Sequence, residues 1–191
     1  MSNCKHKPTQ SQRMATKTLA YSALLAALSV TFARLFGLMP SESSRYSIEA
    51  VPIFIAGMLF GPMAGGMVGF TADFVGCLFS AFGYNPIFCI PPILYGVCGG
   101  IFRKQLSKKV NIPRLVLAYL PAVVLGSILY QSCTLSYMYY DGTFFKGLIY
   151  YLSTRSVQFA IVFVLDVLLT FLLCACGGAP AASSLPDEPA V

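Results

Sequence analysis

Three arginines in this sequence stand within or beside apolar segments, where a permanent charge needs a specific role. They are Arg34, Arg45 and Arg155. A guanidinium group binds a carboxylate through two parallel hydrogen bonds and stays charged in almost any surroundings. Tyrosines accompany them, offering stacking area together with a hydroxyl group: Tyr46, Tyr84 and Tyr139. Gathered at the outer ends of apolar segments, these side chains predict a pocket for a flat, anionic organic ligand.

Asp73 is a carboxylate inside the apolar segment 62–81. On membrane-insertion scales such a charge costs about 2.5–3.5 kcal/mol, so it requires an internal partner or a function. Gly65 and Gly69 share its predicted helix face and allow a neighbouring helix to approach closely. The sequence leaves open whether Asp73 binds a ligand or makes an internal structural hydrogen bond.

Two amide side chains lie at comparable positions. Asn85 stands in the turn 82–86, and Gln158 follows Arg155 by three residues. Asn85 either reads the polar edge of a ligand or is an ordinary residue of a turn or a membrane interface, and Gln158 is a second candidate for reading that edge.

The elements that must position these groups are membrane-spanning helices. Of the 191 residues, 57% are hydrophobic and only 10% are charged, against roughly 25% charged in an ordinary soluble domain. The mean hydropathy is +0.72. This composition predicts an all-α integral membrane protein with one domain and no appended soluble catalytic domain.

Six apolar segments predict a six-helix transmembrane bundle. Because proline ends or kinks a helix, we expect a break at Gly61-Pro62 and irregular backbone at Pro52, at Pro91 and at Pro121. The segments are about 16–38, 48–60, 62–81, 87–102, 115–137 and 145–176. We expect residues 1–14 to be a basic cytoplasmic tail, 15–176 the membrane domain and 177–191 a disordered cytoplasmic tail.

Lysines and arginines gather before the first segment and in the loop 103–114. The positive-inside rule places both regions, and both chain termini, in the cytoplasm. A nucleic-acid role is disfavoured because the basic clusters are short and border apolar segments. The residues are Lys5, Lys7, Arg13 and Lys17, then Arg103, Lys104, Lys108, Lys109 and Arg114.

The sequence lacks the motifs of several enzyme classes. Its 7 cysteines form no C-x-x-C pair and it has 1 histidine, so we expect neither a metal site nor a cofactor. No G-x-x-x-x-G-K-[ST], H-E-x-x-H or G-x-S-x-G pattern occurs. We expect no enzyme activity, and any ATP hydrolysis must come from another chain.

Several stretches resemble a known family. They are Arg34-Leu-Phe, the run from Val51 to Gly66, Ala72-Asp73, Gly83-Tyr-Asn-Pro and Tyr95-Gly. Together they resemble the substrate-binding S components of energy-coupling factor (ECF) transporters, and within that group the folate-specific branch.

The resemblance implies a six-helix bundle in the prokaryotic plasma membrane that captures a vitamin, here folate, from outside. It also implies docking onto a transmembrane coupling subunit, T, which works with two cytoplasmic ATPases. The small-residue motif of the family's first helix matches Ala23 and Ala27, although intramolecular packing is an alternative role for this stripe. The loop 38–47 would act as a lid, and Glu42 and Glu49 add acidic charge near it.

The resemblance also implies roles for the candidate residues in a folate site. The arginines Arg34, Arg45 and Arg155 would bind carboxylates or a ring carbonyl, and Tyr46, Tyr84 and Tyr139 would stack on the ring. Asn85 and Gln158 would read its polar edge, and Asp73 would accept hydrogen bonds from its amino and N–H donors. Two alternatives remain: the same scaffold with another ligand, such as a queuosine precursor, or a membrane enzyme or assembly protein without transport.

Overall fold

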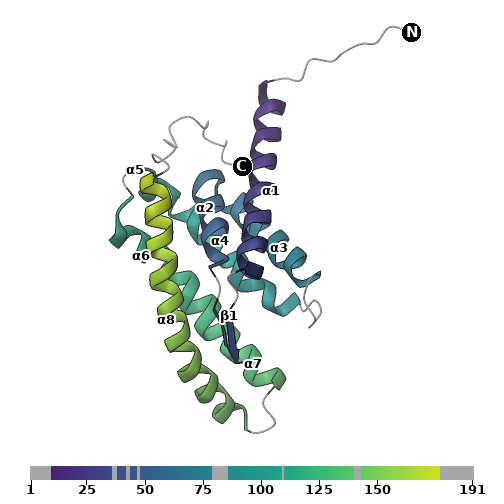
Figure 1. Cartoon of the computed structure of the whole chain (residues 1–191), viewed down its shortest axis with the longest axis vertical. Helices are drawn as coiled ribbons and strands as arrows, with labels where there is room; N and C mark the ends of the chain where they lie inside the picture. Colours follow the sequence, from purple (N-terminus) through teal and green to yellow (C-terminus); the bar gives the residue numbers. More distant parts are fainter. Residues whose placement is uncertain are drawn as a thin grey trace, which may run out of the picture.

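The computed structural model describes residues 10–35, 38–41, 44–46, 48–78, 86–108, 110–139 and 143–176. Helices dominate it, with one short β-hairpin (Figure 1). The elements are α1 (Gln10–Leu35), β1 (Leu38–Ser41), β2 (Ser44–Tyr46), α2 (Ala50–Phe60), α3 (Pro62–Leu78), the 3-10 helix η1 (Pro86–Cys89), α4 (Ile90–Ile101), α5 (Arg103–Lys108), α6 (Ile112–Pro121), the π-helix η2 (Ala122–Tyr130), α7 (Gln131–Tyr139) and α8 (Phe144–Cys176).

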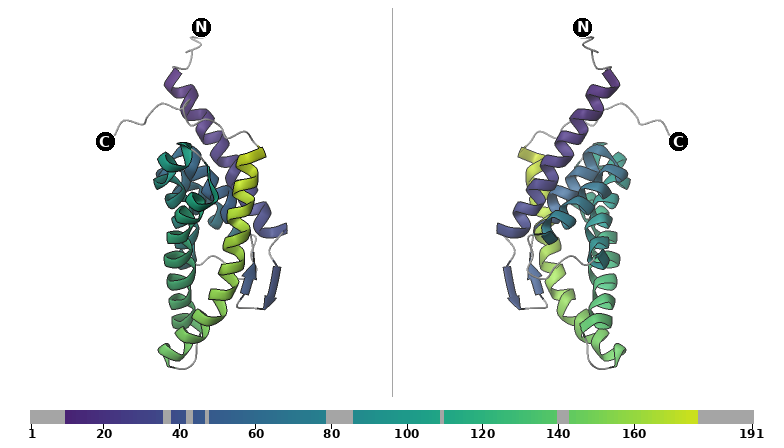
Figure 2. Two further views of the ribbon diagram at one scale, coloured as in Figure 1. Left: turned by 90° about the vertical axis from the view of Figure 1, so that its left-hand side faces the viewer. Right: turned by 90° about the vertical axis from the view of Figure 1, so that its right-hand side faces the viewer.

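Each of the six predicted apolar segments is helical, so the all-α prediction is confirmed. Within the described ranges, three helical stretches are long and apolar enough to cross a membrane: Thr16–Leu35, Ile112–Met138 and Phe144–Cys176. The second is continuous through α6, η2 and α7. Figures 1 and 2 show the start of α1, the end of α8 and the basic helix α5 at one end of the molecule. This arrangement agrees with the predicted placement of the termini and the basic loop on one side.

Two predictions about local backbone are wrong. Pro52 neither kinks nor interrupts α2, because it lies in the first turn, where a backbone N–H has no helical partner to lose. Residues 103–108 of the expected basic loop form the helix α5. The predicted break at Pro62 is confirmed: Gly61, with φ 97°, ends α2 and its N–H donates to the carbonyl oxygen of Gly57 at 2.9 Å.

Pro121 marks a change in helix type rather than a sharp kink. It is the last residue of α6, and the next nine residues form the π-helix η2. Proline removes one helical hydrogen bond and crowds the preceding turn, and a wider π turn accommodates this disturbance.

Glycines bring α2, α3 and α4 into backbone contact. A Cβ atom built on Gly57 or Gly65 would collide with the backbone of Gly96. One built on Gly69 would lie 2.7 Å from the carbonyl carbon of Pro92. The Gly65-x-x-x-Gly69 pattern thus serves a contact between helices inside the chain, in line with its predicted role.

The centre of the bundle is aromatic. Phe54 of α2 stacks on Tyr119 of α6, with ring centroids 3.8 Å apart and planes at 16°. The Tyr119 hydroxyl shares a 2.8 Å hydrogen bond with Thr170 of α8, and the Tyr95 hydroxyl shares one of 3.0 Å with Ser127 of η2. These buried pairs tie α2, α4, η2, α6 and α8 together.

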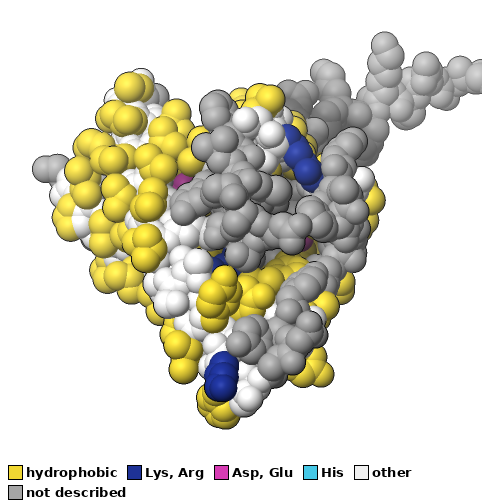
Figure 3. Space-filling model, turned by 60° about the horizontal axis from the view of Figure 1, so that its bottom comes forward, with side chains coloured by type: hydrophobic (Ala, Val, Ile, Leu, Met, Phe, Trp, Pro, Cys, Tyr) yellow, Lys and Arg dark blue, Asp and Glu magenta, His cyan; other side chains and the backbone are white. Residues whose placement is uncertain are grey.

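Residues 38–41 and 44–46, which belong to the segment expected as an outer lid loop, form two antiparallel strands. Leu38 pairs with Tyr46, and Ser41 pairs with Ser44. The hairpin lies beside the half of α8 that is remote from the chain ends (Figures 1 and 2), and β2 packs on α8. Seen from that end, the described surface is largely apolar with few basic groups (Figure 3).

Candidate ligand-binding site

A small polar cavity lies where α1, α2 and α3 meet. Its volume is about 50 Å³. The lining side chains are Ser29, Val30, Ala33 and Arg34 from α1, Glu49 and Ile53 at the start of α2, Ala72, Asp73, Gly76 and Cys77 from α3, and Pro92 from α4. Typical ligand pockets measure roughly 300–1,000 Å³, so this cavity is the floor of a site that must widen to admit an organic molecule.

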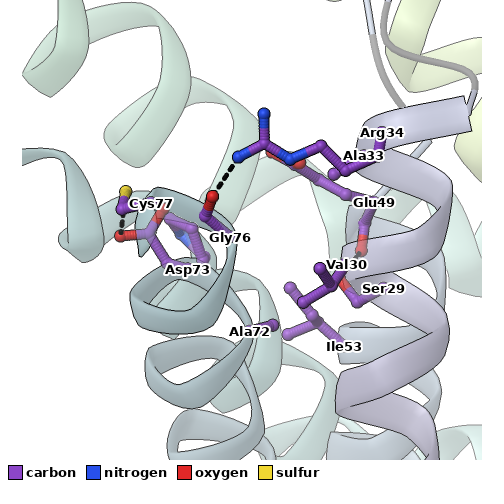
Figure 4. A pocket seen from close by; sticks show the side chains of 11 residues that line it. Ser29, Val30, Ala33, Arg34, Glu49, Ile53, Ala72, Asp73, Gly76 and Cys77 are labelled. Atoms are coloured by element: carbon purple, nitrogen blue, oxygen red, sulfur yellow. Dashed lines mark hydrogen bonds between the residues drawn. The ribbon is translucent and has the colours of Figure 1, made fainter. Parts of the chain in front are cut away.

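One arginine and two carboxylates define the charge of this cavity. The Arg34 guanidinium donates a hydrogen bond to the carbonyl oxygen of Gly76 and so bridges α1 and α3 (Figure 4). Asp73 accepts a weak hydrogen bond from the Cys77 thiol, with the sulfur 3.9 Å from Oδ2. With Glu49, the charged lining carries a formal net charge of −1.

Local structure explains why these groups meet. Glu49 directly precedes α2, and the Ser29 hydroxyl of α1 donates to its carbonyl oxygen at 2.8 Å. This bond fixes the entry to α2 against α1. Asp73 and Gly76 are three residues apart on α3 and therefore lie on one face of that helix.

The structure brings two predicted site residues, Arg34 and Asp73, into this one cavity. It places Arg155 and Gln158 elsewhere, on α8 and outside the lining, with 6% and 1% of their surfaces exposed. The role of each in ligand binding stays a prediction.

The remaining predicted site residues are only partly described. Arg45 and Tyr46 belong to β2, and Tyr139 ends α7, but their side chains lie outside the description. Tyr84 and Asn85 lie outside the described residues altogether.

Sequence reasoning left Glu49 and Ser29 out of the site. Glu49 gave no clear signal, because acidic residues are common at the start of a helix, where they favour the positive end of its dipole. Ser29 gave no signal, since an isolated serine in an apolar helix is common and its partner, a backbone carbonyl 20 residues away, cannot be read from the sequence.

Arg155 is a buried cation in the half of α8 that is remote from the chain ends. Its Cζ lies 5.3 Å from the centroid of the Phe159 ring, and its Nε has no hydrogen-bond partner in the described part of the chain. Ser132 of α7, a helix that packs on α8, is 0% exposed, and its hydroxyl is likewise unpartnered there.

Asp166 is a buried carboxyl group, deeper along α8 than Arg155. It is 0% exposed, and neither oxygen has a hydrogen-bond partner among the described residues. The eleven residues that separate it from Arg155 correspond to about 16 Å along a helix, which is too far for a direct ion pair.

The small-residue stripe on α1 faces outward. Ala23 and Ala27 are exposed, whereas Ala26 and Ser29 of the same helix are buried. Within the described residues, the stripe is therefore not used for intramolecular packing, and its proposed docking role remains open to test.

Comparison with known proteins adds a family likeness. The sequence profile of the ECF-type riboflavin transporter S component matches residues 13–174. The folate transporter FolT of Clostridium novyi (strain NT) is 28% identical over 154 residues, which cover 80% of this chain and 85% of that protein.

Two solved structures share the architecture. The crystal structure of FolT bound with folic acid has a TM-score of 0.71 and 31% identity, covering 83% of this chain and 92% of that one. The S component for biotin from an ECF-type ABC transporter has a TM-score of 0.61 and 19% identity, covering 88% and 95%. The second likeness bears on the fold alone.

Proposed function

The chain belongs to the family of ECF-type riboflavin transporter S components, and we propose that, as a member of this family, it captures folate at the outer face of the membrane for import. As an S component, it is a multi-pass membrane protein that binds a transported vitamin and is not an enzyme. Its transporter also comprises a transmembrane T subunit and ATPase subunits.

The main support for folate is the 31% identity to a FolT structure that contains folic acid, over 83% of the chain. The cavity chemistry agrees. The pterin ring of folate carries an amino group and an N–H along one edge, and a carboxylate is the natural acceptor for such a pair of donors. Asp73 and Glu49 would supply that acceptor edge.

Riboflavin is the second candidate, because the matching family is named for it. Its flavin ring lacks the amino group, so it offers fewer donors to the two carboxylates of the cavity. It is also uncharged, whereas folate carries two carboxylates that suit arginine. The charge pattern of this chain therefore favours folate.

The proposed site combines the cavity with residues around its mouth. Arg34, Arg45 and Arg155 bind carboxylates or a ring carbonyl, and Asp73 binds the ring's donors. Tyr46, Tyr84 and Tyr139 stack on the ring, while Asn85 and Gln158 read its polar edge. Because about 50 Å³ cannot hold folate, binding must separate the walls of the cavity, with residues 38–47 closing over the ligand.

Calorimetric titration of the purified protein in detergent tests this function. Folate should bind one to one at nanomolar concentrations, and riboflavin and a queuosine precursor should not compete. Arg34→Ala should weaken folate binding at least tenfold, because it removes a charge-assisted donor worth about 1.5–3 kcal/mol. The matched control is Lys146→Ala, which removes an exposed cation of α8 outside the cavity.

A folded sample that binds riboflavin or the queuosine precursor, and not folate, would keep the transport role and change the cargo. A folded sample that binds none of them would refute the proposal.

A further inference from the structure

The basic stretch between α4 and α6 has a fixed structure at the end of the molecule where α1 begins and α8 ends (Figure 1). Residues 103–108 form α5, and Leu106 of this helix is 1% exposed. Helix α5 packs on α2, α4 and α6. The buried leucine anchors α5 to the bundle, while Lys104 and Gln105 are exposed. A topology signal needs only positive charge in a loop, so it does not account for this anchoring.

Arg114 joins the first turn of α6 to α5. Its Nη1 donates a hydrogen bond to the carbonyl oxygen of Gln105 at 3.1 Å, and its side chain is exposed. Lys104 directly precedes Gln105, so the Cα atoms of these two residues are about 3.8 Å apart. Lys104 and Arg114 therefore place two positive charges at one junction, and the hydrogen bond holds the arginine there.

This junction of α5 and α6 is positively charged throughout its own sequence. The stretch 101–121 contains no acidic residue. In the described part of the chain, the acidic residues are Glu49 and Asp73, which line the cavity between α1 and α3, and Asp166, which is buried in α8. The charge of the junction thus favours an anionic ligand.

The surface next to Arg114 on α6 is apolar. Leu117 lies three residues further along the helix, hence on the same face as Arg114, and it is 54% exposed. Leu120 follows after three more residues and is 47% exposed. Both leucines belong to the apolar stretch Ile112–Met138, which is long enough to cross a membrane. A ligand that fits both parts of this surface has an anionic head and an apolar chain.

Two other kinds of occupant fit less well. A soluble anion such as inorganic phosphate matches the charge of Lys104 and Arg114 but makes no use of the leucines. An acidic cytoplasmic segment of a partner protein also matches the charge, but it would have to enter the hydrocarbon region to cover Leu117 and Leu120, where its own polar groups lose their contact with water.

We propose that Lys104, Arg114 and Leu117 form a binding site for one anionic phospholipid of the cytoplasmic leaflet. Lys104 and Arg114 donate hydrogen bonds to the headgroup phosphate, and Leu117 and Leu120 contact an acyl chain. Phosphatidylglycerol, which carries a net negative charge, is preferred over phosphatidylcholine, because the same two cations repel the ammonium group of phosphatidylcholine. The site does not depend on which vitamin the chain captures.

Native mass spectrometry of the full chain in detergent tests this site, because it resolves the number and affinity of bound lipids. The wild type should bind one phosphatidylglycerol about 25-fold more tightly than phosphatidylcholine, since each basic side chain near a membrane surface contributes about fivefold in affinity for an anionic lipid. Lys104→Gln and Arg114→Gln should each lower this preference about fivefold. Leu117→Ser should weaken both lipids and keep the ratio.

The matched control is Lys17→Gln, which removes an exposed cation of α1. Figure 1 shows α1 and α5 on opposite sides of the molecule, so this variant should leave both lipid affinities unchanged. Equal losses in Arg114→Gln and Lys17→Gln would indicate unspecific charge attraction and overturn the inference. Lys104→Gln provides the same comparison if Arg114→Gln does not fold. A wild type that binds the two lipids equally would also overturn it.

Three further outcomes separate the lipid from other occupants. Displacement of phosphatidylglycerol by inorganic phosphate, with Leu117→Ser binding the lipid like the wild type, would identify a simple anion site. Asp187→Asn combined with Glu188→Gln should not change the preference; a preference found only in this variant would show that these two acidic residues, which lie outside the described ranges, occupy the junction. If Lys104→Gln loses copurification with the T subunit but keeps its lipid preference, the junction is a protein interface. Each of these results would overturn the inference.

Discussion

Three glycines on α3 allow the closeness of helix packing to be tested by the same substitution, glycine to alanine, and its effect on stability. Adding a methyl group to Gly65, Gly66 or Gly76 alters the same helix, but what the new Cβ meets differs. At Gly65 it meets only backbone, lying 2.9 Å from the carbonyl carbon of Gly96 and 2.5 Å from the Cα of Gly57. At Gly66 it meets side chains, and at Gly76 nothing lies within 4 Å.

The magnitudes follow from these contacts. Backbone atoms at a helix crossing cannot turn aside, so Gly65→Ala should destabilise the protein by about 2–3 kcal/mol, near the upper end of ordinary overpacking. Gly76→Ala gains the helix preference of alanine, about 0.5–1 kcal/mol. Gly66→Ala should fall near zero, because the Val97 methyl 3.2 Å away can rotate and offset that gain.

Thermal unfolding in detergent can resolve this series. For a chain of this size, 1 kcal/mol corresponds to a change in Tm of about 2–4 °C. Gly65→Ala should therefore lower the Tm by about 4–12 °C, and Gly76→Ala should raise it by about 1–4 °C. A thiol-reactive fluorophore can report unfolding as the buried Cys89 and Cys98 become exposed. Equal Tm values for Gly65→Ala and Gly76→Ala would refute the close backbone contact.

Two further predictions concern α1 and α8. Ala23→Trp combined with Ala27→Trp should abolish copurification with the T subunit and leave the folate affinity unchanged. The control Leu24→Trp should preserve copurification. If the complex of the double variant survives, the docking role of Ala23 and Ala27 is wrong. Asp166→Leu should raise the Tm by several degrees in the same fluorescence assay, because the unpartnered carboxyl oxygens cost about 1–3 kcal/mol; a drop would show that the carboxyl group has a partner that the described residues do not include.

Hydropathy and proline placement predicted the fold well, because both act locally. A long apolar segment in a membrane must be helical to satisfy its backbone, so the helical state of all six segments followed from composition. The break at Gly61-Pro62 followed from the missing N–H of proline and the positive φ that glycine adopts. Pro52 was misjudged because the effect of proline depends on how many residues into the helix it lies, and helix starts are difficult to place from sequence.

The candidate site was only partly predictable. Arg34 and Asp73 stood out as charges in apolar segments, and they do share a cavity. That Glu49 joins them depends on how the start of α2 packs against α1 through Ser29, which is a tertiary contact. Ser132 stands out because, in the part of the chain that the structure describes, its hydroxyl lacks the kind of hydrogen bond that Thr134 and Ser136 make. No spacing rule distinguishes these residues on the helix before the neighbouring chain is known.

Helix α1 carries the exposed alanines and the cavity lining at two different levels along one continuous helix. Ala23 and Arg34 are eleven residues apart, or about 16 Å along the axis, with no proline or glycine between them. A shift of the helix at one of these points is therefore felt at the other. If a partner docks on Ala23 and moves α1, it changes the affinity for the ligand, and thermodynamic reciprocity requires the ligand to change the affinity for the partner by the same factor. One helix would then let the transporter distinguish a loaded binding subunit from an empty one.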